Sequence, residues 1–259
     1  EKEEAIQGAD LIVCGVSSFG VDWFADKILP ILDESVPVIS VTKGMLDYED
    51  GTMQTYPEYW QEKLPEGSKL RLYAIGGPCT ARDLSDHDPS FVAYCGPDFE
   101  TLEWIRSLFS TDYYIISLTK DVVGLECAVA LKNGYALGTA LAIGIKEKLG
   151  DDGIDHNNMK SALFQESVKE MLELLRIVGG GVDNIMFAAG DLDVTVSAGR
   201  SRTVGLLLGK GYTIEETLEQ LCENSQIVRY DLKSVNFFVE KVKIPAFIGK
   251  ITIKLTGTK

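Results

Sequence analysis

Histidine and cysteine are both scarce in this chain of 259 residues. The two histidines, His87 and His156, have no Cys, His or acidic neighbours at ligand spacing, so we expect both at the surface and no metal site. The five cysteines are an odd number without CxxC spacing, which argues against a disulfide framework. The scattered cysteines favour a reducing, cytoplasmic location.

Positive charge is also in short supply. The chain has 25 Lys and Arg against 39 Asp and Glu, giving a net charge of −14. A polyanionic backbone would be repelled by this average field, so we do not expect nucleic acid as a partner. A small anionic substrate requires a few Lys and Arg side chains gathered in one pocket.

Long apolar runs are absent. The longest uncharged stretch, Asn133 to Ile145, is shorter than the roughly 18 residues that span a bilayer, so no membrane segment is expected. The acidic start, Glu1 to Glu4, does not resemble a secretory signal. With 45% hydrophobic and 25% charged residues, the composition is that of a folded globular protein.

The first 120 residues or so alternate between two patterns. Apolar runs rich in Val, Ile and Leu predict buried strands at 9–16, 36–41, 70–75 and 113–118, with a further short strand at 91–94. Amphipathic stretches predict helices at 21–32 and 99–109. This alternation predicts the α/β class, with an incomplete sheet of the parallel type.

After residue 121 the pattern becomes helical. Residues 122–148 predict a long buried helix, in which Gly134, Gly138 and Gly144 indicate close approach of another backbone. Further helices are expected at 157–178 and from a capping box at Thr213, whereas alternation after Lys241 predicts an exposed strand. We therefore divide the chain near Thr119, into domains of residues 1–119 and 120–259.

Two segments suggest chemistry. Lys132 and Asn133 interrupt an apolar helix, where an unpaired ammonium would be costly; the alternative is a lysine that reaches solvent. Residues 190–202 combine carboxylates, hydroxyls and two arginines between glycines, and the alternative there is a solvated loop. Residues 205–211 lack the spacing of a Walker motif.

With residues 41–44 (VTKG), these segments resemble the NAD(P)-dependent glycerol-3-phosphate dehydrogenase family. The similarity runs in one order from Ala5 to Leu221 through ADLIVCGVSS, ISVTKG, GGPCTARDL, ECAVALKNGYALGTAL, GDLDVTVSAGRSR and LLLGKG. The resemblance implies the C-terminal part of a Rossmann-type dinucleotide-binding domain in residues 1–119 and an all-helical substrate-binding domain in residues 120–259.

The resemblance also implies an oxidoreductase that uses NAD or NADP and interconverts dihydroxyacetone phosphate and sn-glycerol 3-phosphate. Its implied catalytic residues are Lys132 as general base, Lys43 and Asp191. The implied substrate contacts are Lys43, Gly77, Cys79, Lys132, Asn133, Asp191, Thr195, Arg200 and Ser201. The implied cofactor contacts are Ser17, Ser18, Phe19, Lys43, Ala81, Arg200 and Gln226. The expected partner is a small phosphorylated substrate, and the formation of a homodimer is left as an open alternative.

Several positions depart from the family pattern. Ser201 replaces an Asn, Cys79 replaces a Ser, and Gln226 stands where a Glu is usual. A Pro is also missing between Val16 and Ser17. Two alternatives therefore stay open: a dehydrogenase of the same fold for another phosphorylated polyol or hydroxy acid, and a non-catalytic nucleotide-sensing homologue.

The sequence contains no GxGxxG motif, with which a dinucleotide fold cradles the pyrophosphate. We expect roughly 60 to 80 residues with this motif before Glu1 and poor dinucleotide binding by this chain alone. The choice between NAD and NADP would also lie there.

Overall fold

The computed structural model describes residues 2–48, 52–150 and 157–221. The chain packs into two compact units. The first unit comprises Glu1–Ala130 with Leu175–Phe187, and the second comprises Leu131–Leu174 with Ala188–Lys259. This division follows Ala130, later than the predicted domain division near Thr119.

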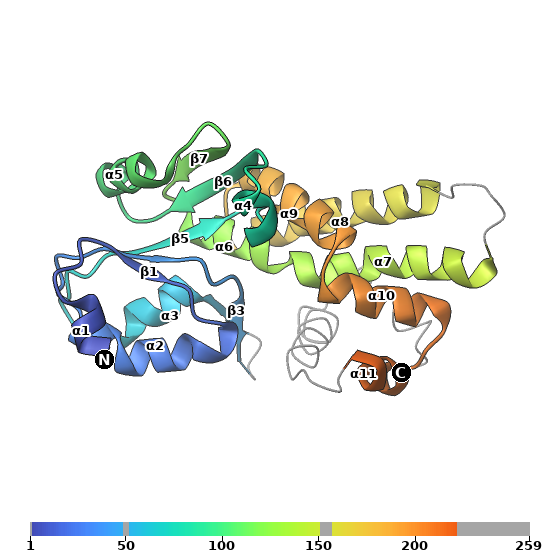
Figure 1. Ribbon diagram of the computed structural model, residues 1–259, viewed down its shortest axis with the longest axis horizontal. Coiled ribbons are helices and arrows are strands. Elements are labelled where there is room, and N and C mark those ends of the chain that lie inside the picture. The colour runs from blue at the N-terminus through green and yellow to red at the C-terminus, as the bar shows by residue number, and fades with distance from the viewer. Residues whose placement is uncertain (1, 49–51, 151–156, 222–259) are drawn as a thin grey trace. The chain divides into compact units, whose positions relative to one another are not determined.

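A five-stranded sheet forms the centre of the first unit (Figure 1). Its strands, in the order β1-β2-β5-β6-β7 across the sheet, are β1 (Ile12–Cys14), β2 (Val38–Ser40), β5 (Leu72–Gly76), β6 (Ser90–Cys95) and β7 (Tyr114–Thr119). All five apolar runs predicted as strands lie in this sheet, which confirms the α/β class.

The expectation of a parallel sheet is wrong at one position. Strands β1, β2 and β5 are parallel, and so are β6 and β7, but β6 runs antiparallel to β5. The chain returns from β5 to β6 with only α4 (Ala81–Ser85) between them, and an antiparallel neighbour needs no long crossover. The β6 to β7 connection carries α5 (Phe99–Phe109), as a parallel crossover requires.

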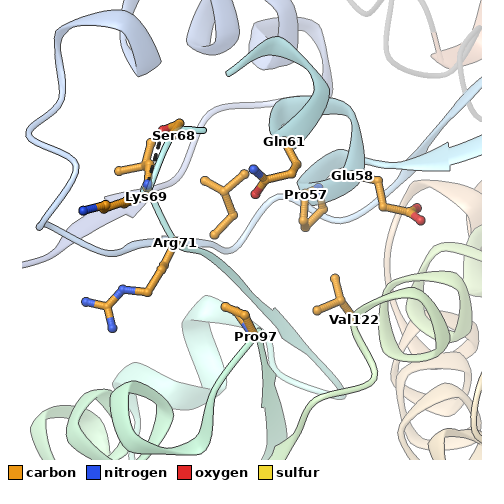
Figure 2. Close-up of a pocket in the computed structure, with 10 residues that line it drawn as sticks. Pro57, Glu58, Gln61, Ser68, Lys69, Arg71, Pro97 and Val122 are labelled. Atoms are coloured by element: carbon orange, nitrogen blue, oxygen red, sulfur yellow. Dashed lines mark hydrogen bonds between the residues drawn. The ribbon is translucent and has the colours of Figure 1, made fainter. Parts of the chain in front are cut away.

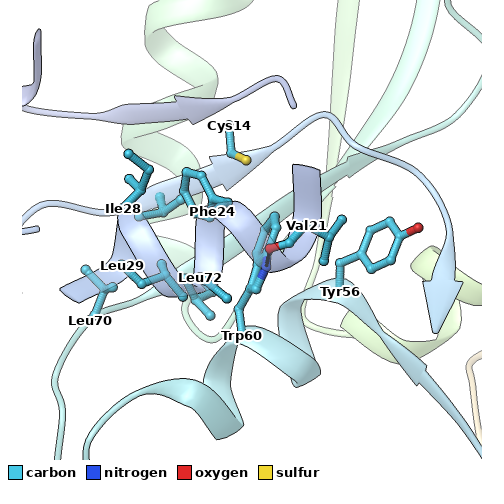
Figure 3. Packing of buried hydrophobic residues seen from close by; sticks show 11 residues of the cluster. Cys14, Val21, Phe24, Ile28, Leu29, Tyr56, Trp60, Leu70 and Leu72 are labelled. Carbon is cyan, nitrogen blue, oxygen red and sulfur yellow. Dashed lines mark hydrogen bonds between the residues drawn. The ribbon is translucent and has the colours of Figure 1, made fainter. Parts of the chain in front are cut away.

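Helices pack against the sheet around a buried cluster (Figure 3). The helices that contribute to this cluster are α2 (Val21–Lys27), η2 (Leu29–Ile31) and α3 (Tyr56–Lys63). The unit also contains α1 (Lys2–Ile6), η1 (Ser18–Gly20), α6 (Val122–Ala130) and η3 (Val182–Asn184). The rings of Phe24 and Trp60 lie 4.8 Å apart, and Trp60 Nε1 donates to the Val21 carbonyl at 3.1 Å. The indole therefore joins α2 to α3 without leaving its N–H unpaired.

One part of the first unit was not predicted from the sequence. A hairpin of β3 (Met45–Asp47) and β4 (Met53–Thr55) leads directly into α3. The Thr55 side chain accepts from the Glu58 backbone N–H, while Glu58 accepts from Thr55, which forms a capping box. Thr-x-Pro-Glu was the available signal, because Pro suits the first helical turn.

Every element in the described part of the second unit is helical, as predicted. The helices that build it are α7 (Lys132–Leu149), α8 (Asn157–Ile177), α9 (Ile185–Ser197), α10 (Arg200–Lys210) and α11 (Ile214–Leu221). The capping box predicted at Thr213 is confirmed, since its N–H donates to Glu216 at 2.7 Å and its hydroxyl accepts at 3.1 Å.

The predicted helix at 122–148 is two helices, α6 and α7, separated only by Leu131. The break falls where the polar Lys132 and Asn133 interrupt the apolar sequence and where the chain passes between units. The close approach predicted at Gly144 is confirmed, because a Cβ there would lie 2.1 Å from the Leu206 carbonyl oxygen of α10. The loop alternative for residues 190–202 is wrong, since α9 and α10 cover most of them.

By length and composition, residues 122–149 also qualify as a candidate membrane span, with a mean hydropathy of 1.3 in their best window. Inside the structure 67% of that window is buried, as in a core helix. The strand predicted after Lys241 lies outside the described residues.

Candidate functional site

The carboxyl ends of β1, β2 and β5 lie at one edge of the first unit's sheet, because these strands are parallel. Ser17, Ser18 and Phe19 lie in the segment after β1, separated from its end by two residues, and Phe19 is 54% exposed. The Thr42 hydroxyl, after β2, donates to the Val16 carbonyl at 2.6 Å and joins the two loops. This edge is where ligands bind in open α/β sheets.

Lys43 reaches across this edge to the loop after β5. Its Nζ donates to the Gly77 carbonyl at 2.7 Å, and its side chain is half-buried. Gly77 has a φ of +114°, and a Cβ there would lie 3.1 Å from Val92 Cα and 3.2 Å from the Phe91 carbonyl. The glycine therefore lets the chain turn where its carbonyl can hold the ammonium.

Two further predicted contacts follow Gly77. Cys79 is half-buried, and its Sγ lies 3.8 Å from the Thr80 carbonyl. Thr80 caps α4 by accepting from the Asp83 N–H at 3.2 Å, which places Ala81 in the exposed first turn. The first unit thus brings the predicted residues after β1, β2 and β5 to one edge of its sheet.

In the second unit, Lys132 and Asp191 form a largely buried ion pair. Lys132 begins α7 and Asp191 lies on α9, and their Nζ and Oδ1 atoms are 2.7 Å apart. The side chains are 15% and 3% exposed. The alternative in which Lys132 extends into solvent is therefore wrong, because the carboxylate provides the partner that a buried ammonium needs.

The other predicted residues of this unit lie on α7, on α9 and further along the chain. Thr195, one turn after Asp191, donates its hydroxyl to the Asp191 carbonyl at 2.6 Å, and Asn133 is half-buried beside Lys132 in sequence. Ser201 is buried in the first turn of α10. Arg200 begins α10, but its side chain is not among the described groups, and Gln226 lies outside the described residues.

Sequence reasoning missed Glu126, a fully buried carboxyl on α6 in the first unit. Burial raises its pKa to about 8, against an opposing effect of the Lys43 ammonium. Neither carboxyl oxygen has a hydrogen-bond partner within the described residues. The available signal was the Glu of ECAVAL, the one charged residue between Val122 and Leu131.

A pocket of about 390 Å³ lies elsewhere in the first unit (Figure 2). Side chains from α3 and from residues 68–72 line it together with Pro97 and Val122. None of the predicted site residues lines this pocket. Within the described ranges, no group of three or more His, Cys, Asp or Glu side chains could hold a metal ion.

Family models match both halves of the chain. The model described as NAD-dependent glycerol-3-phosphate dehydrogenase C-terminus matches residues 121–253. The model described as NAD-dependent glycerol-3-phosphate dehydrogenase N-terminus matches residues 1–100.

Curated relatives agree with these matches. The NADP(+)-dependent glycerol-3-phosphate dehydrogenase of Archaeoglobus fulgidus is 29% identical over 221 residues, which cover 85% of this chain and 64% of the relative. Glycerol-3-phosphate dehydrogenase [NAD(P)+] of Moorella thermoacetica is 32% identical over 221 residues, which cover 83% of this chain and 61% of that relative. The chain thus spans a little under two thirds of the length of these relatives.

Solved structures show the same fold. Glycerol-3-phosphate dehydrogenase from Coxiella burnetii has a TM-score of 0.80 at 21% identity, covering 99% of this chain and 75% of that chain. The glycerol-3-phosphate dehydrogenase structure from Saccharomyces cerevisiae has a TM-score of 0.81 at 20% identity, and the match covers 100% of this chain and 75% of that chain. These matches confirm the predicted combination of a Rossmann-type domain and a helical domain.

Proposed function

The chain belongs to the NAD-dependent glycerol-3-phosphate dehydrogenase family, and we propose that its protein transfers a hydride between NAD(P)H and dihydroxyacetone phosphate to give sn-glycerol 3-phosphate. The observation that carries the proposal is the buried pair of Lys132 and Asp191. A lysine held at a largely buried position by a carboxylate is suited to move a proton at the reacting oxygen.

Lys132 would donate its proton to the oxygen of the carbonyl carbon during reduction and take it back during oxidation. Asp191 would position the ammonium and stabilise its charge. Lys43, anchored at Gly77, would place a positive charge toward the anionic substrate. NAD(P)H, when bound, supplies the hydride.

The described residues suit the nicotinamide end of such a cofactor. An exposed aromatic ring, Phe19, and the hydroxyls of Ser17 and Ser18 follow β1 at the sheet edge where Lys43 also lies. Aromatic and hydroxyl groups can contact a flat, amide-bearing ring by packing and hydrogen bonding. In the proposal Ala81, Arg200 and Gln226 complete the cofactor contacts.

Arg200 would bind the phosphate, because its planar guanidinium can contact two oxygens at once. The remaining proposed substrate contacts are Gly77, Cys79, Asn133, Thr195 and Ser201. A nucleotide domain of residues 1–119 and a substrate domain of residues 120–259 are part of this proposal, as is a homodimer.

A cytoplasmic location is also proposed. Cys14, Cys95 and Cys127 are buried free thiols and Cys79 is a half-buried one, which suits a reducing compartment. Fractionation of the native host with a non-reducing gel tests it. A disulfide-linked form in the exported fraction would contradict it.

The activity test uses the full-length gene product. NADH and NADPH oxidation are followed by absorbance with dihydroxyacetone phosphate, unphosphorylated dihydroxyacetone, a phosphorylated ketose and a 2-keto acid. We expect turnover of dihydroxyacetone phosphate and little or none of its unphosphorylated form, because the proposed site holds the phosphate. Preference for another compound would favour the alternative substrate class suggested by Cys79 and Ser201. Dinucleotide binding without any turnover would favour the non-catalytic alternative.

A further inference from the structure

Glu126 lies in the interior of the first unit, where water cannot solvate its carboxyl group. Its side chain is 0% exposed, and both oxygens lack hydrogen-bond partners within the described residues. A buried carboxylate without such partners is strongly unfavourable compared with its neutral form. Packing alone does not explain a Glu here, because an apolar side chain of similar size would fill the same space without the cost of desolvating a carboxyl group.

The neighbours of Glu126 on α6 place it against the strand ends. Leu125 and Val129 pack on Gly76 at the end of β5, where an added Cβ would lie 2.8 Å from Leu125 Cγ. Cys127 Sγ lies 3.4 Å from Met45 Sδ on β3. Glu126 thus lies on a helix segment that touches the end of β5 and the beginning of β3, and Lys43 joins these two places through its bond to Gly77.

The electrostatic surroundings of Glu126 are simple. The Lys43 ammonium is the charge that lowers its pKa, whereas burial raises it to about 8. On β6, burial and then the charge of Glu126 raise the pKa of Cys95. Next to Glu126 on the same helix, burial and then the charges of Glu58, Glu126 and Asp121 raise the pKa of Cys127 to about 12. Lys43 is therefore the cationic group to which Glu126 responds.

We propose that Glu126 is a positioning residue that sets how much positive charge Lys43 presents to an anionic substrate. While Glu126 is protonated, the charge of Lys43 is left for the substrate. When Glu126 loses its proton to water, the buried carboxylate attracts the ammonium and offsets that charge. The inference rests on the proposed role of Lys43 at the substrate, and it assigns Glu126 no contact with substrate or cofactor.

Binding measured by calorimetry against pH tests the proposal with sn-glycerol 3-phosphate, whose phosphate is mostly doubly ionised from pH 7 to 9. If only the form with protonated Glu126 binds well, the dissociation constant of the wild-type protein increases about tenfold from pH 7 to pH 9. Glu126→Gln cannot ionise and should remove this increase. Glu62→Gln, at an exposed position on α3, is the matched control and should keep it.

Infrared spectra provide a readout that does not depend on ligand or turnover. The carbonyl band of a protonated carboxyl should be present at pH 7, decrease by pH 9 and be missing in Glu126→Gln. If the Gln variant does not fold, Glu126→Met replaces it with an apolar side chain of similar length. A wild-type dissociation constant that does not change with pH would overturn the inference, and so would an unchanged profile in both variants.

Failure of the inference can be told from failure of the proposed function. A wild-type protein that reduces dihydroxyacetone phosphate at pH 7 but shows no pH effect dependent on Glu126 contradicts the inference alone. A protein that neither binds sn-glycerol 3-phosphate nor reduces dihydroxyacetone phosphate contradicts both.

Discussion

Lys132 Nζ and Asp191 Oδ1 lie 2.7 Å apart, although the two residues are 59 positions apart in sequence. Both side chains are largely buried, so the second unit encloses an ammonium and a carboxylate that compensate each other. Removing either partner takes a buried counter-charge away from the other. The pair is therefore both part of the proposed active site and a determinant of the stability of this unit.

Replacing Lys132 tests its proposed role as the proton carrier. Lys132→Ala should lower turnover of dihydroxyacetone phosphate by about 10² to 10⁴, the usual contribution of a general acid or base. Dinucleotide affinity, measured separately by fluorescence titration, should stay nearly unchanged. Lys169→Ala on α8, an exposed lysine, is the control and should leave turnover unaffected. Near-normal turnover in Lys132→Ala would mean that another residue carries the proton.

Replacing Asp191 tests the structural role of the same pair. Asp191→Ala should lower the free energy of unfolding by about 3 kcal/mol, because the buried Lys132 loses the carboxylate 2.7 Å from its Nζ. Urea unfolding of Asp191→Ala, of Lys132→Met and of the double variant should show that the two losses of stability do not add. The same cycle applied to the exposed pair of Lys169 and Glu166, whose charged atoms are 3.2 Å apart, should give an interaction energy below about 1 kcal/mol. Additive losses at Lys132 and Asp191 would contradict an interaction between them.

The Arg200 prediction depends on guanidinium chemistry. Arg200→Lys in the full-length protein should raise KM for dihydroxyacetone phosphate far more than KM for the dinucleotide, because an ammonium cannot contact two phosphate oxygens in one plane. Steady-state kinetics with each compound varied in turn measures both constants. An unchanged KM for the phosphorylated compound would place the phosphate elsewhere.

The strands were predictable from their apolar runs, which are largely buried in β2, β5 and β6 and partly exposed in the edge strands β1 and β7. The antiparallel placement of β6 was not, because it depends on the path of the chain after Gly77 and not on the composition of residues 90–95. Likewise, the helices at 185–210 were obscured by residues that also suit loops, such as Asp191, Thr195 and Ser201. Packing of α10 on α7 through glycines overrides those local preferences.

The sequence predicted some residues of the candidate site and missed another, because burial depends on packing that no local sequence pattern specifies. Lys132 and Asp191 came from motifs, and the structure adds that they are paired. Glu126 was missed, because a single Glu in an apolar helix reads equally well as a residue that reaches solvent. Its burial depends on the strand ends packed against α6, which no local sequence pattern specifies.

The turn at Gly77 can be tested by adding one methyl group. Gly77→Ala should lower the free energy of unfolding by about 2 to 3 kcal/mol, because a positive φ is combined with crowding against the backbone of Val92. Gly67→Ala is the matched control, since Gly67 has a φ of +82° but nothing within 4 Å of its added Cβ. Its cost should be about 1 kcal/mol. Equal losses in the two variants, measured by urea unfolding, would show that the close approach at Gly77 has no effect.

Burial of Glu126 also predicts how stability varies with pH. Its pKa is about 8 in the folded chain, against about 4.3 for a free Glu, so the folded state holds the proton more tightly. The stabilising contribution of that proton is therefore complete below about pH 4, decreases as the pH rises to about 8 and is lost above that. Between these limits the free energy of unfolding should decrease by about 1.4 kcal/mol per pH unit more in the wild-type protein than in Glu126→Gln. Urea unfolding at pH 5, 6, 7, 8 and 9 measures the difference, and Glu62→Gln should follow the wild-type slope. Parallel slopes for the wild-type protein and Glu126→Gln would show that Glu126 is ionised at neutral pH in the folded chain.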